Sequence, residues 1–556
     1  MEPKQIIEEA IERVVMHGLG PDEKMPGFVV EHPADESHGD YATNVAMMMN
    51  GNPRELAQGL AEKLKKSEVL GEVVDLFRIE VAGPGFINFW LKDDYLMKRL
   101  EELKGLSEKC GQGDFMEGKK MLVDYSSPNI AKRFSVGHLR STIIGQAICN
   151  LYKFSGAKVV SDNHLGDWGT QFGMIIAAVE EKNLDVSTMT VGDLENLYVD
   201  FNKRIAETPK LKDKAREAFA RLEQGESKAR EIWQKSKDVS MEEFYKIYEK
   251  LGVPKFDFEY GESAYEDLMP GIIEEAKKKG VVRESEGAWI VEYKDENGKE
   301  YMPPAMLLKS NGTTTYFTRD LATVKKRISE DALRSNLYIY EVGSEQTLHF
   351  RQVFATIELL GWAKKEQFVH VAHGFMTLPE GKMSTRKGNT VKLEDLLGRA
   401  AGAATDERIA IGAVKYNELK RAPGMDYVFK WDEALSMEGN SGPYLQYVYV
   451  RCKGVLEKVG NKFGATTSLN EDERKLLTAL LRFGDGEIVE GAARNFAPQQ
   501  VCAYLFDLAQ RFNGFYDRNR VGGSENEGFR LLLTAVTGQV IKNGLALLGI
   551  EVVKKM

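Results

Sequence analysis

The spacing of hydrophobic and polar positions changes twice along the chain. Up to about residue 115 it predicts a helix, a turn-rich stretch EHPADESHGDYATNVAM, a second helix and an alternating strand pair around IEVAGPGFINFWL. A polar, glycine-rich connector, KCGQGDFMEGKK, follows. We therefore predict an N-terminal α+β domain over residues 1–115.

From Met121 onward, short apolar runs alternate with amphipathic helices. The runs are MLVDYS, KVVSDN, NLYIYEVG and FVHVAHGF, with one helix beginning near Gly137 and another in TLHFRQVFATIELLGW. Such alternation is typical of a parallel sheet built from βαβ units. We predict a doubly wound, Rossmann-like domain over residues 116–395. A charged, largely helical insertion at about 178–300, followed by a possible hairpin in WIVEYKDENGKEYM, splits this domain.

Residues 396–556 show helical periodicity throughout and almost no strand signal. We predict a separate all-α bundle there. The chain is thus expected to be a multidomain α/β protein with an α+β domain in front and a helical domain behind.

Length, composition and net charge limit the kinds of protein that this chain can be. A chain of 556 residues is too long for one core, since domains hold roughly 100–200 residues. The sequence contains no run of eighteen consecutive apolar residues that could span a membrane. The N-terminus MEPKQIIEEAIERVV lacks the basic and apolar regions of a signal peptide, so we expect a cytoplasmic protein. The four cysteines are scattered without zinc-ligand or disulfide spacing. A net charge of −9 argues against nonspecific coating of nucleic acid but allows local basic faces.

The stretch YSSPNIAKRFSVGHLRST joins a strand to a helix and has the features of an anion site. Pro128 excludes a helical conformation for Ser127, so a turn leaves the strand. The helix N-terminus near Gly137 and His138 offers free N–H groups and the positive end of the helix dipole. Open α/β folds bind nucleotides at this edge of the sheet. The alternative is a surface turn with solvated charges.

A second candidate phosphate loop is excluded by its residues and its place. GDFMEGKK nearly fits the P-loop pattern, but Lys120 stands where a hydroxyl would hold magnesium. The stretch also precedes a strand instead of following one.

Five ordered segments carry a resemblance to a known family. They are SPNIAKRFSVGHLRST, NHLGDWGTQFG, YFTRDLAT, GKMSTRKGN and GPYLQYVYVR. Together they resemble the arginyl branch of the class I aminoacyl-tRNA synthetases over essentially the whole chain. The resemblance implies that arginine and ATP form arginyl-adenylate and pyrophosphate, and that the arginyl group then passes to the terminal ribose of tRNA.

Two departures from the signatures of that family concern the phosphate-binding elements. The first histidine of the HIGH signature is Ser135 here, and the fourth residue of KMSKS is Thr385. Ser135 can still hydrogen-bond a phosphate oxygen but carries no charge. Lys132 is our candidate to replace the lysine that KMSKS has at the position of Thr385.

The resemblance also implies individual residues of the site. A guanidinium is bound best by carboxylates, which accept two parallel hydrogen bonds from its planar N–H groups. Asp320 has an alternative role as an ordinary helix cap or salt-bridge partner. The implied catalytic residues are His138, Lys132, Ser135, Lys382 and Lys387; those for ATP are Gly137, His138, Lys382, Met383 and Ser384; those for arginine are Asp124, Asn129, Tyr316, Asp320 and Gln346.

Aromatic and basic residues in the first and last domains suggest RNA contacts. Stacking on aromatic rings and guanidinium groups is how unpaired bases are bound. The alternatives are core packing in the bundle and an ordinary hairpin in front. The candidate tRNA contacts are Phe86, Asn88, Tyr444, Tyr447, Arg451, Phe515, Tyr516 and Arg518. The resemblance assigns the front domain to the tRNA corner and the bundle to the anticodon.

Three functions remain to be distinguished: an arginine–tRNA ligase, another class I synthetase, and a weakened paralogue that binds tRNA or senses arginine. The segment NHLGDWG and the helical C-terminal domain favour the first. We expect ATP with Mg²⁺, L-arginine and tRNA(Arg) as partners, a monomer, no structural zinc and no other metal site. His370 and His373 on one strand would point to opposite faces, so we interpret them as structural.

Overall fold

The computed structural model describes residues 2–18, 24–378, 406–428, 430–434 and 439–556, together with 381, 382, 398, 402 and 436. Two compact units emerge. One comprises residues 1–112, 448–487 and 506–543, and the other comprises residues 113–447, 488–505 and 544–556. The predicted boundaries at 115/116 and 395/396 stay predictions.

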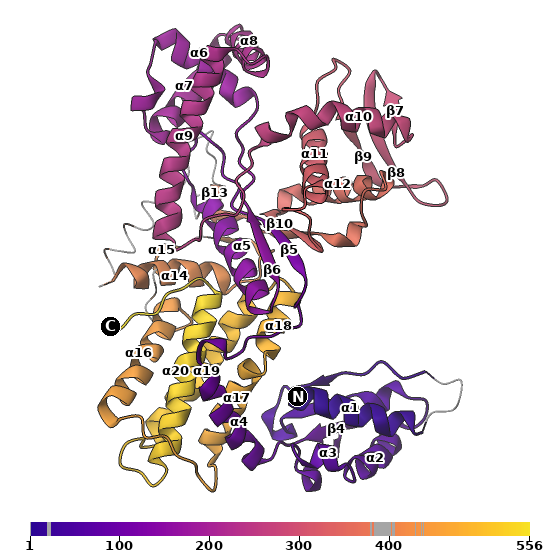
Figure 1. Ribbon diagram of the computed structural model, residues 1–556, viewed down its shortest axis with the longest axis vertical. Helices are drawn as coiled ribbons and strands as arrows, with labels where there is room; N and C mark the ends of the chain where they lie inside the picture. The colour runs from indigo at the N-terminus through magenta and orange to yellow at the C-terminus, as the bar shows by residue number, and fades with distance from the viewer. Residues whose placement is uncertain are drawn as a thin grey trace. The chain divides into compact units, whose positions relative to one another are not determined.

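The second unit contains the predicted parallel sheet (Figure 1). Its order is β11-β10-β5-β6, and both neighbours of β5 run parallel to it. Chain order therefore reverses between β5 and β10, which creates a topological switch point. The strands are β5 (Lys120–Asp124), β6 (Lys158–Asp162), β10 (Leu337–Gly343) and β11 (Phe368–His373).

Helices α5 (Val136–Phe154) and α12 (Thr347–Leu359) connect these strands, and α5 packs against β5, β6 and β10. Close approach requires Gly145, because a Cβ there would lie 2.3 Å from the Tyr125 side chain. Each apolar run named in the sequence thus forms the strand or helix that was predicted.

The insertion between β6 and α11 is helical at first and then forms a second sheet. An antiparallel sheet, β7-β8-β9, pairs Tyr293 with Met302, which confirms the hairpin. The polar strand β7 was not predicted. The elements are α6 (Thr170–Lys182), α7 (Val191–Glu207), α8 (Leu211–Glu223), α9 (Ser227–Lys250), α10 (Met269–Lys278), β7 (Val282–Ser285), β8 (Ala288–Lys294), β9 (Glu300–Leu308) and α11 (Tyr316–Ser329).

A core of buried aromatic and aliphatic side chains ties this second sheet to β5, β6 and β10, with Leu122, Tyr293, Leu321 and Ile357 each at most 1% exposed. Short elements follow the parallel sheet. They are β12 (Met376–Leu378), β13 (Gly381–Lys382), α14 (Glu407–Leu419), β14 (Tyr427–Val428) and α15 (Trp431–Ala434).

The first unit contains the antiparallel sheet of the front domain, in the order β1-β2-β4-β3. Val81 pairs with Ile87 across the GPG turn, which confirms the strand pair predicted there. The elements are α1 (Pro3–Met16), β1 (Val30–Glu31), β2 (Tyr41–Thr43), α2 (Pro53–Leu64), α3 (Glu68–Gly71), β3 (Glu80–Ala82), β4 (Phe86–Phe89) and α4 (Asp93–Leu106).

The last part of the described chain is helical, as predicted. Its helices are α16 (Gly442–Val459), α17 (Glu471–Gly484), α18 (Glu487–Arg494), α19 (Pro498–Arg518) and α20 (Glu527–Leu547). All four cysteines of the chain are buried, unbridged thiols. In the described part of the chain, no helix combines the length and the apolar character that a membrane crossing needs.

Candidate functional site

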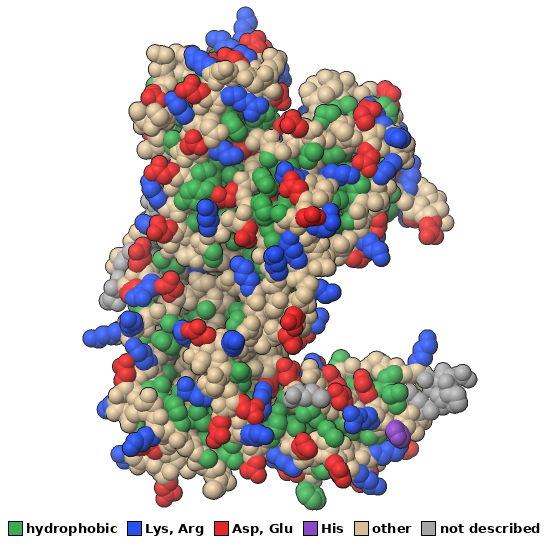
Figure 2. All heavy atoms as spheres, in the orientation of Figure 1, with side chains coloured by type: hydrophobic (Ala, Val, Ile, Leu, Met, Phe, Trp, Pro, Cys, Tyr) green, Lys and Arg blue, Asp and Glu red, His purple; other side chains and the backbone are tan. Residues whose placement is uncertain are grey.

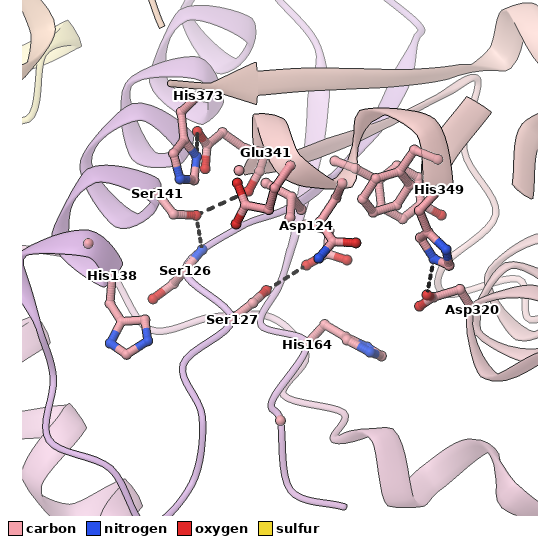
Figure 3. Close-up of a pocket in the computed structure, with 18 of the residues that line it drawn as sticks. Asp124, Ser126, Ser127, His138, Ser141, His164, Asp320, Glu341, His349 and His373 are labelled. Carbon is pink, nitrogen blue, oxygen red and sulfur yellow. Dashed lines mark hydrogen bonds and ion pairs between the residues drawn. The ribbon is translucent and has the colours of Figure 1, made fainter. Parts of the chain in front are cut away.

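A cavity of about 990 Å³ lies at the carboxyl ends of β5, β10 and β11. This position is the switch point of the sheet, where open α/β folds bind their ligands. Figure 3 shows its labelled side chains converging from the parallel strands, α5, α11 and α12. Eight of the predicted site residues line it: Asp124, Asn129, Ser135, Gly137, His138, Tyr316, Asp320 and Gln346.

The loop after β5 takes an unusual backbone path. Ser126 and Ser127 have φ angles of 74° and 45°, in the left-handed region that L-residues rarely adopt. The amide of Ser126 donates to Oγ of Ser141 on α5 at 3.0 Å, and that hydroxyl in turn donates to the Glu341 carbonyl on β10. These bonds fasten α5 to the sheet edge at the cavity.

Helix α5 begins at the cavity with Ser135 as its N-cap. The Ser135 amide donates to Nδ1 of His138 at 3.2 Å, so one orphan N–H of the helix start is satisfied by the imidazole. A Cβ added to Gly137 would meet only the Ser135 hydroxyl, at 3.5 Å. Space therefore remains beside the helix start for an anion.

His138 is neutral in this environment. Burial, reinforced by the charges of Lys132 and His373, lowers its pKa to about 4. Because Nδ1 accepts from Ser135, the proton of the neutral ring resides on Nε2. His138 is thus a neutral hydrogen-bond donor.

Asp124 is committed to a buried ion pair. Its Oδ2 lies 2.7 Å from Nη2 of Arg327, and its Oδ1 accepts from the Ser127 hydroxyl at 3.2 Å. Arg327 is fully buried and also holds Asp162 at 2.7 Å. The two carboxylates hold the pKa of Arg327 well above its usual range, although burial opposes this. Contact between Asp124 and a substrate would have to compete with this pair.

We expect Arg327→Met to destabilise the protein by about 3–5 kcal/mol, because two buried carboxylates would lose their counter-ion. Urea unfolding followed by circular dichroism measures this change. Arg334→Met is the matched control on the neighbouring loop, since Arg334 is 60% exposed and its partner Asp331 is 92% exposed. It should shift the unfolding midpoint far less. Equal midpoints for wild type and Arg327→Met would contradict the structural role.

The opposite side of the cavity carries Tyr316 and Asp320 one turn apart on α11. Nε2 of His349 donates to Oδ2 of Asp320 at 2.5 Å. Burial opposes ionisation of Asp320, but this hydrogen bond and the His349 charge outweigh it and lower the pKa of the carboxyl. Asp320 is therefore an ionised acceptor in the cavity wall. It also forms a salt bridge, the alternative role considered for it, with His349.

Further ionisable residues line the cavity, and sequence reasoning gave them no role there. Arg319 lies 3.3 Å from Glu262 and 3.2 Å from Glu266. Burial raises the pKa of Glu262 to about 7, although the Arg319 charge opposes this. Glu341 and His373 form a second ion pair at the ends of β10 and β11. The motif YFTRDLAT contains Arg319, and His373 was interpreted as a structural residue of its strand.

The segment NHLGDWGTQFG divides its residues between the cavity and the core. His164 lines the cavity. The carboxylate of Asp167 is buried and accepts from the Ser263 amide and from Lys237. Trp168 is 3% exposed and packs edge-on against Trp233, so it is a packing anchor.

Other predicted site residues lie elsewhere. Lys132 lies 5.6 Å from the ring centroid of Tyr198 and does not line the cavity. Met383, Ser384 and Lys387 lie outside the described residues, as does the side chain of Lys382. Among the described residues, no group of three or more His, Cys, Asp or Glu side chains could hold a metal ion.

The candidate tRNA contacts differ in exposure. Phe86 is 36% exposed, whereas Asn88 on the same strand is 3% exposed. On α16 and α19, Tyr447 and Tyr516 are exposed, but Phe515 is fully buried. Burial counts against direct RNA contact by Asn88 and Phe515 and fits the core and hairpin alternatives.

The remaining candidates lie on α16 and α19. The Arg451 guanidinium lies 5.5 Å from the Tyr516 ring centroid and donates to Asn513 at 2.8 Å, while Arg518 pairs with Asp472. Tyr444 is half-buried. Figure 2 shows Lys and Arg side chains interspersed with Asp and Glu side chains on the face that it draws.

Three family models match the chain. The catalytic domain of class I tRNA synthetases (R) matches residues 104–431, the arginyl tRNA synthetase N-terminal domain matches residues 1–91, and the DALR anticodon binding domain matches residues 445–556. The chain belongs to the arginyl-tRNA synthetase family. This confirms the resemblance found in the five motifs and the predicted fold class.

Individual members of the arginyl-tRNA synthetase family are similar over the full length. An arginine–tRNA ligase of Azotobacter vinelandii is 36% identical over 586 residues, covering 100% of this chain and 99% of the relative. One from Clostridium botulinum is 37% identical over 557 residues, covering 95% and 96%. The crystal structure of arginyl-tRNA synthetase from Plasmodium falciparum has a TM-score of 0.81 at 26% identity and covers 100% of both chains.

Proposed function

We propose that this protein is an arginine–tRNA ligase that activates L-arginine with ATP and transfers it to the 3′ end of tRNA(Arg). Family membership over the whole chain supports the activity. The observation that carries the site assignment is one cavity that joins the start of α5, with Gly137 and His138, to the ionised Asp320.

In the first step, a carboxylate oxygen of arginine attacks the α-phosphorus of ATP, the bond to the bridging oxygen breaks, and pyrophosphate leaves. The substrate is the nucleophile, so the protein has to align the reactants and stabilise phosphate charge. The free amides at the start of α5 and Nε2–H of His138 supply hydrogen bonds to phosphate oxygens. Mg²⁺ arrives with ATP as part of the substrate.

Arginine is oriented by its guanidinium. Asp320 accepts from the guanidinium fork, beside Tyr316 and Gln346, and Asn129 holds the other end of the amino acid. Asp124 contributes more weakly to arginine binding because its carboxylate is already paired with Arg327. Lysine cannot reproduce a planar bidentate contact, so this wall selects for arginine.

The second step needs tRNA. A ribose hydroxyl at its 3′ end attacks the carbonyl carbon of arginyl-adenylate, and AMP leaves. We assign the anticodon to the helical domain through Tyr447, Tyr516, Arg451 and Arg518, and the tRNA corner to Phe86. The segment with Lys382, Met383, Ser384 and Lys387 is assigned to pyrophosphate on its sequence. We further propose that the protein acts as a cytoplasmic monomer.

Amino-acid-dependent ATP–pyrophosphate exchange tests this function. All twenty amino acids are compared, each with and without tRNA. The proposal expects exchange with arginine only, and only when tRNA is present. Exchange with another amino acid would identify a different class I synthetase. No exchange despite retained tRNA binding would identify the weakened paralogue. The departures from the family signatures at Ser135 and Thr385 are the reason for considering this alternative.

A further inference from the structure

The pair formed by His373 and Glu341 has no part in the function described so far. His373 is the last residue of β11, and Glu341 lies near the end of the adjacent β10. Nδ1–H of His373 donates to Oε1 of Glu341 at 2.8 Å. Both residues line the cavity, and Figure 3 shows them facing each other beside Ser141 of α5.

Burial differs between the two partners. Glu341 is fully buried, whereas the His373 side chain is 16% exposed. The carboxylate occupies Nδ1, so Nε2, across the ring, remains for a ligand in the cavity. A buried carboxylate favours the charged form of a histidine to which it is hydrogen-bonded. Burial opposes protonation, but Glu341 raises the pKa of His373 above its ordinary value.

The other cationic side chains in the cavity wall are engaged. Arg140 donates to the carbonyls of Gly374, Pro423 and Met425. Arg319 lies between two carboxylates, and His138 is neutral. His373 lines the cavity beside α5 and has its Nδ1 paired with Glu341, so it can meet an anionic ligand there through Nε2.

We propose that His373, held as an imidazolium by Glu341, binds the triphosphate of ATP through Nε2–H. This inference rests on the proposed function and extends its ATP site from α5 to the end of β11. Figure 3 shows the His373 and His138 rings on the side of the cavity next to α5, away from Asp320 and His349. A charge-assisted hydrogen bond to phosphate is among the stronger polar contacts in proteins.

The expected effect of His373→Gln is a rise of about tenfold or more in the KM for ATP, with the KM for arginine within about twofold of wild type. His370→Gln is the matched control, three residues earlier on β11. His370 bonds the Val342 carbonyl and does not line the cavity, so its variant should match wild type. An unchanged ATP KM for His373→Gln, or a larger effect on arginine, would overturn the proposal.

The pH dependence separates a charged contact from a structural one. His373 has a raised pKa, so ATP affinity should be highest at low pH and fall as pH rises through that pKa. His373→Gln should remove this dependence, and Glu341→Gln should move it to lower pH. The groups that face His373 are Glu341, Arg140, His138, His370, Glu345 and Glu418. A dependence that persists in His373→Gln would contradict the proposal.

Direct binding of Mg²⁺-ATP by calorimetry keeps this test independent of the ligase activity. If wild type charges no tRNA but His373→Gln still weakens ATP binding, the proposed function fails and the nucleotide contact stands. If wild type charges tRNA with arginine and both proteins bind ATP equally, the contact fails alone.

Discussion

Asp320→Asn should raise the KM for arginine roughly ten- to a hundredfold while leaving the KM for ATP within about twofold, because one charged hydrogen bond contributes roughly 1.5–3 kcal/mol. Asparagine keeps the shape of the side chain but offers a guanidinium only one neutral oxygen. The hydrogen bond from His349 keeps the wild-type carboxyl ionised, which is the state that binds the guanidinium. Arginine- and ATP-dependence of pyrophosphate exchange measure the two constants.

His349→Gln is the matched control for Asp320. It removes the imidazole partner but leaves the carboxylate in the cavity wall, so its effect on arginine should be smaller than that of Asp320→Asn. If the two variants had equal defects, Asp320 would act only as the partner of His349. Equal increases in both KM values for Asp320→Asn would also exclude guanidinium recognition.

His138→Ala should lower the rate of pyrophosphate exchange by about 10²–10³-fold, the usual cost of removing one donor to a developing anion. His138 is a neutral donor with a pKa of about 4, so this loss should be nearly the same across neutral and alkaline pH. Initial rates at saturating arginine, ATP and tRNA measure it.

The start of α5 provides the control for this variant. Ser135→Ala alters the other half of the capping box but leaves the imidazole in place, so its rate loss should be at least about tenfold smaller. Circular dichroism and the unfolding midpoint establish that His138→Ala is folded. Near-normal exchange by a folded His138→Ala would remove the catalytic role of this residue.

The sequence predicted the parallel sheet and the place of the cavity because both follow from local patterns. Runs such as MLVDYS and NLYIYEVG have the apolar character of buried strands, and the turn at Pro128 marks the exit toward α5. The position of Gly137 at a helix start likewise follows from the periodicity after it. Helix α5 in fact begins at Val136.

Charge pairing within the cavity could not be predicted, because it depends on contacts between distant residues. Arg327 and Asp124 are 203 positions apart, and Glu341 meets His373 only through the register of two adjacent strands. The pairing of Asp124 with Arg327 and that of His373 with Glu341 were therefore not predicted from the sequence. For the same reason, the sequence did not predict that Asn88 and Phe515 are buried. Their burial depends on neighbouring elements rather than on their own segments.

A crystal structure with L-arginine and a non-hydrolysable ATP analogue tests the central claim most directly. We expect the guanidinium at Asp320 and the phosphates at the start of α5, beside His138, in the cavity at the carboxyl ends of β5 and β10. Nucleotide bound away from α5, or an arginine side chain directed away from Asp320, would contradict it.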